Sequence, residues 1–565
     1  MQKSLLLAKS NIRKSIGQLA AIFILILVAS LLLNIWLVLA VDYSKNFERR
    51  AEKLNSEDAA FVFFSQNEEY KNYISDVLNK DGRTDIYTME NCLAFDASSR
   101  YRNGEMATFY IGLPVERAFK RNLGQYRIVE ESEIIPENAV WLPYLYKDGG
   151  NYLIGDDFSV MLFNKTYNLK VAGFYENMLT GSFNSGICTL LFDNEVYQRI
   201  EEENGQGILA VLTSVKLKNR LDSEKFIGQT IRAVMQKYPL INHSSTYFDF
   251  CRQSRTLTAD ICSSIVSGVA FLTVIIAVVV LVSNIANYIG ENMRNLGVLK
   301  AVGYQSKQLV RFLLLQFTAV GFLGTMLGII LSYTFLPVLN KMLIVQTGIP
   351  YTVSFQPLPM LLTFFIVLVT IFAAVLLSTR KIKRIEPIIA LRQGIQTHSF
   401  RKNYIPLDNT SLPLCIALSF KTAFTNVKQN IAMFITVTVL SLLTVFSSVM
   451  IQNFILDTSD FLGLVAGERA DVAIGISGQG EQKFRKDMPE DKRVEKVYLY
   501  STITVYNGEN SIFCYVTESA DDLNNPNMCY EGRLPIYANE VAIAGKYAEE
   551  NDFKIGSVIS LKRGG

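Results

Sequence analysis

Residues 261–290 read ICSSIVSGVAFLTVIIAVVVLVSNIANYIG, a stretch without a charged side chain between Asp260 and Glu291. A helix needs about 20 apolar residues to cross the hydrocarbon core of a bilayer, which is about 30 Å thick. The backbone of such a segment must be helical, because unpaired amide and carbonyl groups in lipid cost several kcal/mol each. The stretch therefore predicts a membrane-spanning helix and places the chain among integral membrane proteins.

Four further segments share this pattern, so we expect five membrane spans. They are residues 17–41, 312–339, 360–378 and 429–456. Their composition explains why 50% of all 565 residues are hydrophobic and only 19% charged, against about 25% in a typical soluble protein. Two alternatives remain. The first segment resembles a cleaved signal peptide, although its apolar part exceeds the usual length of about 7–15 residues, and the other four resemble buried helices of a large soluble protein.

The composition also argues against several classes of function. The net charge of +3 is too small to indicate a nucleic-acid-binding protein. The chain has two histidines, His243 and His398, and their separation argues against a histidine-rich metal site or a Ser-His-Asp enzyme. The sequence has no G-x-x-x-x-G-K-[ST] stretch, so it lacks the usual phosphate-binding loop for ATP. We therefore expect no catalytic, metal-binding or cofactor-binding residue in this chain.

The distribution of lysine and arginine predicts the orientation of the spans. The loops 291–311 and 380–428 are rich in basic residues, whereas the loop 337–356 contains one lysine. Because cytoplasmic loops carry the basic excess, the first two loops are expected in the cytoplasm. Alternation then places the N-terminus in the cytoplasm and residues 42–259 and 457–565 outside. The basic residues of 380–428 also suit a contact with anionic lipid headgroups.

An internal repeat divides the chain into two modules. The sequence NIRKSI at 11–16 precedes the first span, and NVKQNI at 426–431 precedes the fifth. Five further identities recur at a constant offset of 401 positions: Asn138, Val140, Tyr146, Ile154 and Gly155 match Asn539, Val541, Tyr547, Ile555 and Gly556. The first module then comprises a helix, an outer domain and three helices. The second comprises a helix and about half an outer domain. We therefore interpret the chain as a fragment of a longer, eight-helix protein. The alternative is a naturally short second module.

The first outer segment, residues 42–259, has the pattern of a mixed α+β domain. Residues 160–163 and 169–174 are short apolar runs bounded by turn residues, which is typical of strands. Residues 223–238 place apolar side chains along one side of a helix. Together with the five spans, these patterns predict an α-helical integral membrane protein with mixed α+β extracytoplasmic domains.

The seven cysteines have no metal-ligand spacing. An extracytoplasmic location permits disulfides, so bridges between Cys92 and Cys188 and between Cys514 and Cys529 are open alternatives to free thiols.

Residues 291–303 read ENMRNLGVLKAVG and follow directly after the second span. This segment resembles the cytoplasmic signature of FtsX-like permeases, the MacB/LolE type of ABC transporter subunit, whose pattern is roughly E-x-x-R-E-I-G-V-L-R-A-L-G. Asn295 stands where the family usually has an acidic residue. The sequence RIEPIIALR at 384–392 resembles the family's terminal Pro-x-x-Ala-Leu-Arg, and GRLP at 532–535 resembles part of the MacB-type periplasmic core domain.

In the family that this segment resembles, the corresponding helix docks into a groove on the ATPase subunit. The resemblance therefore implies these ATPase-coupling residues: Glu291, Arg294, Leu296, Gly297, Val298, Leu299, Lys300 and Gly303. The residues themselves favour a short helix at the inner membrane face, because Ile289, Met293, Leu296 and Leu299 recur at helical spacing. A solvated connecting helix is the alternative. Gly303 is placed to cap its C-terminus.

Three glycines of the third span, Gly321, Gly324 and Gly328, are candidates for close helix packing. Their alternative interpretation is the general use of glycine in membrane helices.

The resemblance implies a permease subunit in the bacterial plasma membrane that couples ATP hydrolysis by a separate ATPase, present as a dimer, to export or handling of an amphipathic substrate. The alternative is an FtsX-type signalling subunit that acts on a cell-wall hydrolase, a sensor kinase or another accessory extracytoplasmic protein. The expected partners are thus the ATPase and the lipid bilayer, with no nucleic acid.

The expected segments are the cytoplasmic N-terminus with the first span at 1–41, the first outer domain at 42–259, a permease domain at 260–395, a cytoplasmic linker at 396–428, a fifth span at 429–456, and a partial outer domain at 457–565.

Overall fold

The computed structural model describes residues 16–102, 104–163, 165–239, 241–351, 355–379, 427–456, 492–508, 510–520 and 528–563, with a few isolated residues and residue pairs between 413 and 523. The motif expected at 384–392, almost all of the linker 396–428 and most of 457–491 lie outside the described residues.

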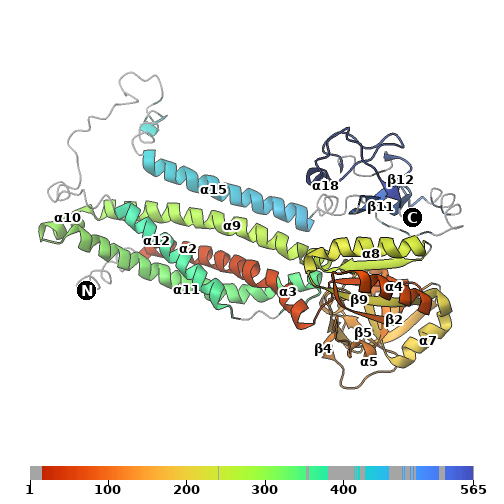
Figure 1. Ribbon diagram of the computed structural model, residues 1–565. Helices are drawn as coiled ribbons and strands as arrows, with labels where there is room; N and C mark the ends of the chain where they lie inside the picture. The colour runs from red at the N-terminus through yellow and green to blue at the C-terminus, as the bar shows by residue number, and fades with distance from the viewer. Residues whose placement is uncertain are drawn as a thin grey trace.

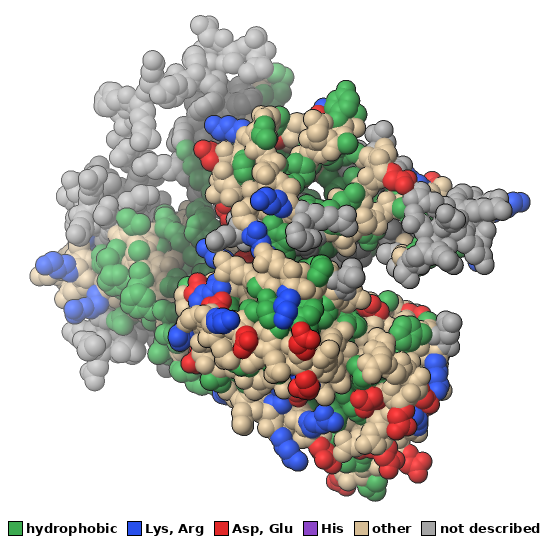
Figure 2. Space-filling view, turned by 45° about the vertical axis from the view of Figure 1, so that its right-hand side comes forward, with side chains coloured by type: hydrophobic (Ala, Val, Ile, Leu, Met, Phe, Trp, Pro, Cys, Tyr) green, Lys and Arg blue, Asp and Glu red, His purple; other side chains and the backbone are tan. Residues whose placement is uncertain are grey.

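Among the described residues, five helices are long and apolar enough to cross a membrane, as the sequence predicts. They are α2 (Ile16–Val38), α9 (Phe248–Glu291), α11 (Ser306–Thr347), α12 (Pro357–Thr379) and α15 (Val427–Ile451). The helices run side by side, with a folded domain at one end and the short α10 (Met293–Ala301) at the other (Figure 1). Figure 2 shows hydrophobic side chains exposed on the bundle and charged side chains spread over the folded domain. The protein is therefore a multi-pass membrane protein.

The helices α2, α9, α11 and α12 share one buried apolar cluster, which includes Ile22, Leu281, Leu313 and Ile371. Hydrogen bonds between side chains join three of them. Asn34 on α2 donates from Nδ2 to Ser332 Oγ of α11 (2.6 Å) and accepts from Thr363 Oγ1 of α12 (3.2 Å). Helix α2 is thus an integral wall of this bundle.

Glycines allow α11 to approach α2 closely. A Cβ atom at Gly324 would lie 3.1 Å from the carbonyl oxygen of Phe23, and one at Gly328 would lie 2.5 Å from that of Leu27 and closer still to Ser30 Oγ. Gly321 lies instead against Ile371 of α12. The backbone of α2 thus occupies the space that side chains at Gly324 and Gly328 would need.

The folded domain contains a ten-stranded mixed sheet, in which nine strands follow the order β10-β1-β9-β2-β3-β8-β5-β7-β4 and the tenth, β6, pairs with β2 and β7. The strands are β1 (Ala59–Phe63), β2 (Thr84–Tyr101), β3 (Gly104–Pro114), β4 (Arg127–Glu131), β5 (Ala139–Pro143), β6 (Asp157–Leu162), β7 (Lys165–Glu176), β8 (Cys188–Phe192), β9 (Leu209–Leu217) and β10 (His243–Tyr247). The strands expected at 160–163 and 169–174 correspond to β6 and β7, and the helix expected at 223–238 is α8 (Ser223–Lys237).

Strand β6 closes part of this sheet into a barrel, because it pairs with β2 on one side and β7 on the other. The ring runs β2-β3-β8-β5-β7-β6. Alternate residues of β2, Leu93, Phe95 and Ala97, join Phe158 and Val160 of β6 in one buried cluster. Beyond the barrel, α4 (Glu68–Lys80) and α8 cover the extension of the sheet formed by β9, β1 and β10.

The second domain repeats backbone features of the first. The hairpin of β11 (Tyr500–Asn507) and β12 (Asn510–Thr517) has a two-residue turn like that between β2 and β3, with positive φ at Gly508 (62°) and at Arg102 (56°). At offset 401, φ is 89° at Gly155 and 90° at Gly556. The helix α6 (Leu145–Asp148) also recurs as α18 (Gly545–Glu550).

One part of the repeat differs. Ala139–Pro143 forms the buried strand β5, hydrogen-bonded to β7 and β8, whereas the matching residues 540–544 form no strand. A strand exists only with a hydrogen-bonded neighbour, and the described residues offer none there.

All seven cysteines are free. The possible Cys92–Cys188 bridge is not formed, because β3 lies between the strands β2 and β8 that carry these residues. The possible Cys514–Cys529 bridge is not formed either.

We predict that Gly328→Leu destabilises the bundle by about 1–3 kcal/mol, because the new side chain collides with the backbone of α2. The matched control is Gly268→Leu on α9, where a Cβ atom meets nothing within 4 Å. The measurement is the thermal unfolding midpoint of the detergent-purified protein. Equal midpoints for the two variants would show that the α2–α11 contact is not tight.

Candidate functional site

The end of the bundle away from the folded domain is formed by a helix break, a short helix and a tight turn. Helix α9 ends at Glu291, Asn292 takes a non-helical conformation, and α10 runs from Met293 to Ala301. Gly303, whose φ is 101°, follows the end of α10. Its N–H donates to the Lys300 carbonyl, and the N–H of Tyr304 donates to the Leu299 carbonyl, both at 3.0 Å. This double hydrogen-bond pattern with a left-handed glycine is the Schellman motif, as expected for Gly303.

The described side chains of α10 divide between two sides. Gly297 is buried, and Leu299 packs against the apolar cluster of the bundle, which also contains Ile289. Val298 is 42% exposed and Val302, just beyond the helix, is 74% exposed. Lys300 is half-buried. The side chains of Glu291, Arg294 and Leu296 lie outside the described part of the structure.

A second arrangement joins the other end of the bundle to the folded domain. Phe47 and Ala51 of α3 (Ser44–Lys53), Phe248 and Cys251 of α9, and Ile349 after α11 belong to the same buried cluster as the core residues of the domain. The helix ends and the domain therefore share one continuous apolar core.

Arg255 of α9, which is 1% exposed, lies in this junction and precedes the apolar span Ala259–Asn287. Its Nε donates to the Thr347 carbonyl (2.9 Å) and Nη2 to that of Gly348 (3.3 Å) at the end of α11. Its Nη1 donates to the carbonyls of Asn177 (2.8 Å) and Met178 (2.7 Å) in the domain. Burial lowers the pKa of Arg255 to about 10, so the guanidinium stays charged at neutral pH.

The carbonyls of Thr347 and Gly348 form the negative end of the α11 dipole, so they attract a cation. Arg255 thereby holds two membrane helices and a domain loop at one point. The sequence does not single it out, because nothing around Arg255 distinguishes it from Arg252 one turn earlier.

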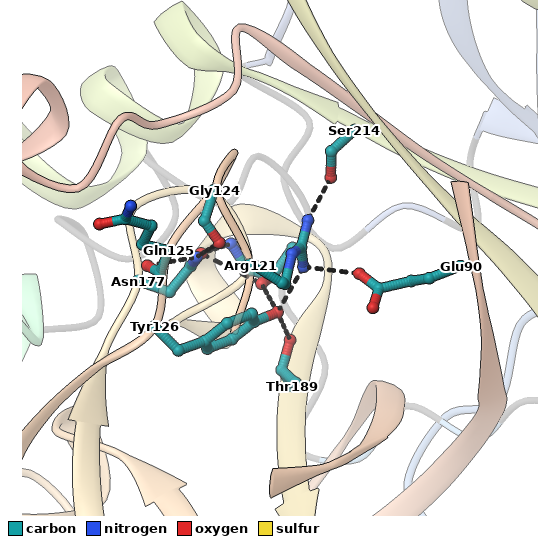
Figure 3. A network of polar contacts seen from close by, with 9 residues as sticks. Glu90, Arg121, Gly124, Gln125, Tyr126, Asn177, Thr189 and Ser214 are labelled. Carbon is teal, nitrogen blue, oxygen red and sulfur yellow. Dashed lines mark hydrogen bonds and ion pairs between the residues drawn. The ribbon is translucent and has the colours of Figure 1, made fainter. Parts of the chain in front are cut away.

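A buried polar network continues from Asn177 into the domain (Figure 3). Asn177 Nδ2 donates to the carbonyls of Gly124 (3.2 Å) and Gln125 (3.3 Å). Arg121, whose side chain is 6% exposed, forms an ion pair with Glu90 (3.1 Å) and donates to Ser214 Oγ (2.7 Å). This network fixes the loop that follows α5 (Val115–Ala118) against the sheet.

Glu57 lies beside this network without a hydrogen bond to either carboxylate oxygen among the described residues. It is fully buried beneath Gly124. Burial raises the pKa of Glu57, and the charge of Arg121 opposes this only in part. An ionised Glu57 is therefore a cost to the folded state.

We predict that this cost appears as a pH dependence of stability. Because the pKa of Glu57 is higher in the folded state, its contribution is fully favourable below the usual glutamate pKa of about 4.3 and is lost as the pH rises toward the folded value. Glu57→Gln should therefore gain in thermal midpoint over the wild type as the pH is raised from acid to neutral. Exposed Glu52→Gln is the control, and a constant difference between Glu57→Gln and the wild type would contradict the prediction.

We further predict that Arg255→Lys destabilises the protein by about 3 kcal/mol or more. A single ammonium group does not reach four carbonyls on two sides, and each hydrogen bond to a charged group is worth about 1.5–3 kcal/mol. Arg252→Lys is the matched control, because among the described residues Arg252 forms an ion pair with the half-exposed Asp249 alone (3.4 Å). Thermal midpoints that fall equally in both variants would contradict a special role of Arg255.

Among the described residues, no group of three or more His, Cys, Asp or Glu side chains is placed to hold a metal ion.

Residues 267–387, from within α9 to beyond α12, match the family described as FtsX-like permease C-terminal. These residues are an FtsX-like permease domain. The FtsX-like domain contains α10, the glycines of α11 and the end of α11 that Arg255 contacts. FtsX-like permeases belong to ABC-type transporters, are generally non-catalytic membrane subunits and imply an ATPase partner.

No curated protein matches this chain. Among solved structures, the chain is similar to the extracellular domain of the noncanonic ABC-type transporter YknZ from Gram-positive bacteria. That structure is 9% identical, covers 34% of this chain and 98% of its own, and has a TM-score of 0.18.

Proposed function

We propose that this chain is a permease subunit whose separate ATPase, acting as a dimer, docks on α10. The observation that carries the proposal is the position of α10 within the FtsX-like domain, at the end of the bundle opposite the folded domain (Figure 1). Val298 and Val302 are four residues apart and exposed, so they offer an apolar contact. ATP is bound by the partner, and this chain holds no cofactor.

The coupling residues inferred from the sequence then have two roles. Gly297 and Leu299 are turned toward the bundle, so they hold α10 in place rather than touch the ATPase. Val298 is turned outward and is the better candidate for a direct contact. We keep Glu291, Arg294, Leu296, Lys300 and Gly303 as further members of the coupling segment.

Motion of α10 has a direct path to the folded domain. Helix α9 runs without interruption for 44 residues from the domain to Glu291. At its domain end, Arg255 and the shared apolar core join it to α11 and to the sheet. We therefore propose that α9 transmits movement driven by ATP hydrolysis across the membrane.

In this proposal the N-terminus and α10 lie in the bacterial cytoplasm, and the folded domain lies outside. The domain then handles an amphipathic substrate such as a peptide, an antibiotic, a lipid or a lipoprotein. In the alternative function, the same movement of the domain regulates a cell-wall hydrolase or a sensor kinase without transport.

We predict that Val298→Asp combined with Val302→Asp abolishes co-purification of the proposed partner ATPase, because two charges replace the exposed apolar contact. The variant should insert and unfold like the wild type, since neither side chain belongs to the buried core. Asn295→Asp, an exposed position on the same helix, is the control for added charge. Undiminished co-purification of the ATPase with the double variant would disprove docking on α10.

Transport and signalling are separated by a reconstitution experiment. Proteoliposomes with the ATPase and ATP should accumulate or release a labelled amphipathic peptide or lipid if the complex is a transporter. ATP-dependent stimulation of an added hydrolase or kinase, without substrate movement, would favour the signalling function.

A further inference from the structure

The β11–β12 hairpin of the second domain lies against helix α8 of the folded domain (Figure 1). At the turn of the hairpin, the carbonyl of Gly508 accepts a hydrogen bond from Nη1 of Arg232 on α8 (3.2 Å). The guanidinium of Arg232 also lies over the ring of Tyr506, 5.6 Å from its centroid, which is within the range of a cation–π contact. One side chain of the folded domain thus contacts both the turn and an aromatic ring of the second domain.

The burial of Tyr506 distinguishes it from other aromatic residues on the same face of the hairpin. Tyr506, Phe513 and Tyr515 share one face, because alternate residues of a strand and residues directly opposite in an antiparallel pair point the same way. Phe513 is 62% exposed and Tyr515 is 67% exposed, whereas Tyr506 is 6% exposed. We attribute this difference to α8, which Tyr506 meets through Arg232.

The internal repeat supports this attribution. Asn507 and Tyr101 are the last paired residues before the two turns, so Tyr506 matches Arg100 of the hairpin formed by β2 and β3. Arg100 is exposed. The fold of the hairpin therefore does not by itself bury a side chain at this position, and the burial of Tyr506 reflects a contact between the two domains.

The amphipathic pattern of α8 places Arg232 where it can make this contact. Phe226, Ile231 and Val234 hold the apolar side of the helix against the sheet of the folded domain. The period of 3.6 residues places Arg232 on the opposite side of α8, where it is half-buried. Helix α8 also contacts α9, the long helix that continues into the bundle. The hairpin therefore rests on an element that is itself fixed to the folded domain.

We propose that the outer side of α8 is a docking surface for the second domain, with Arg232 as its anchor and the Gly508 turn and the Tyr506 ring as the docked elements. Arginine and tyrosine are among the residues that carry most of the binding energy at interfaces. The docked hairpin joins the two domains, so a movement of the folded domain is passed to the second domain. This docking does not depend on the binding of an ATPase.

The test measures the solvent accessibility of the Tyr506 side chain in the full chain in detergent, by hydroxyl-radical footprinting and mass spectrometry. Tyr515, exposed on the same face of the hairpin, is the internal reference. The variant is Arg232→Ala. The matched control is Lys225→Ala, which removes an exposed cation two turns earlier on the same side of α8. Tyr175, buried in the core of the folded domain, reports whether that domain stays folded.

In the wild type and in Lys225→Ala, we expect Tyr506 to be modified several-fold more slowly than Tyr515. In Arg232→Ala, the rate at Tyr506 should rise toward that at Tyr515, because a hydrogen bond to a charged group is worth about a factor of ten or more in the docking equilibrium. Equal rates at Tyr506 and Tyr515 in the wild type would overturn the proposal. Continued protection of Tyr506 in Arg232→Ala, with Tyr175 also protected, would overturn the role of Arg232 as the anchor.

Discussion

The buried guanidinium of Arg255 is the interaction on which the junction between membrane and domain depends. A charge removed from water is costly unless hydrogen bonds replace its hydration. Here four carbonyls do so, two from the end of α11 and two from a loop of the domain. Because the same cation satisfies both groups, neither can move away without leaving a buried charge unpaired. Two spans and the sheet domain are thus constrained to move as one unit at this point.

The centre of the bundle is likewise held together by polar groups and close backbone contacts. Gly324 and Gly328 bring the backbones of α11 and α2 into close contact, and the hydrogen bonds of Asn34 join α2 to α11 and α12. Such contacts are needed in a bilayer, because apolar side chains interact with lipid tails about as well as with other helices. Helix α15 differs: none of its described side chains within the membrane window is fully buried, and it packs mainly against α9. The FtsX-like permease domain, with α2, therefore forms the compact body, and α15 lies at its side.

Much of the fold was predictable because it follows from local patterns. A run of about 20 uncharged residues specifies a span. A glycine with positive φ after an apolar-periodic helix specifies the end of that helix, as at Gly303. The strands β6 and β7 were predictable from their apolar runs, but the closure of the barrel by β6 was not, because pairing depends on residues far apart in the chain. For the same reason the sequence gives no sign of Arg255, whose acceptors come from residues near 177 and 347. The contact of Arg232 with Gly508, 276 positions further along the chain, is hidden from the sequence in the same way.

In and around α10, the sequence predicts eight coupling residues between Glu291 and Gly303 but does not separate those that hold the helix in place from those on its surface. That distinction depends on which way the short helix is turned, and this is set by Leu299 packing on the bundle. The resemblance to FtsX-like permeases identifies the segment, whereas only the structure shows that Val298 is exposed on the outer side of the helix.

The uninterrupted length of α9 has a mechanical consequence. At a rise of 1.5 Å per residue, its 44 residues extend about 66 Å, more than twice the thickness of the hydrocarbon core. Such a rod acts as a lever arm: a tilt of about 5° about one end displaces the other by about 6 Å, close to the pitch of one helical turn. An angular change too small to disturb the packing of side chains at the pivot thus becomes a displacement large enough to exchange contacts at the far tip.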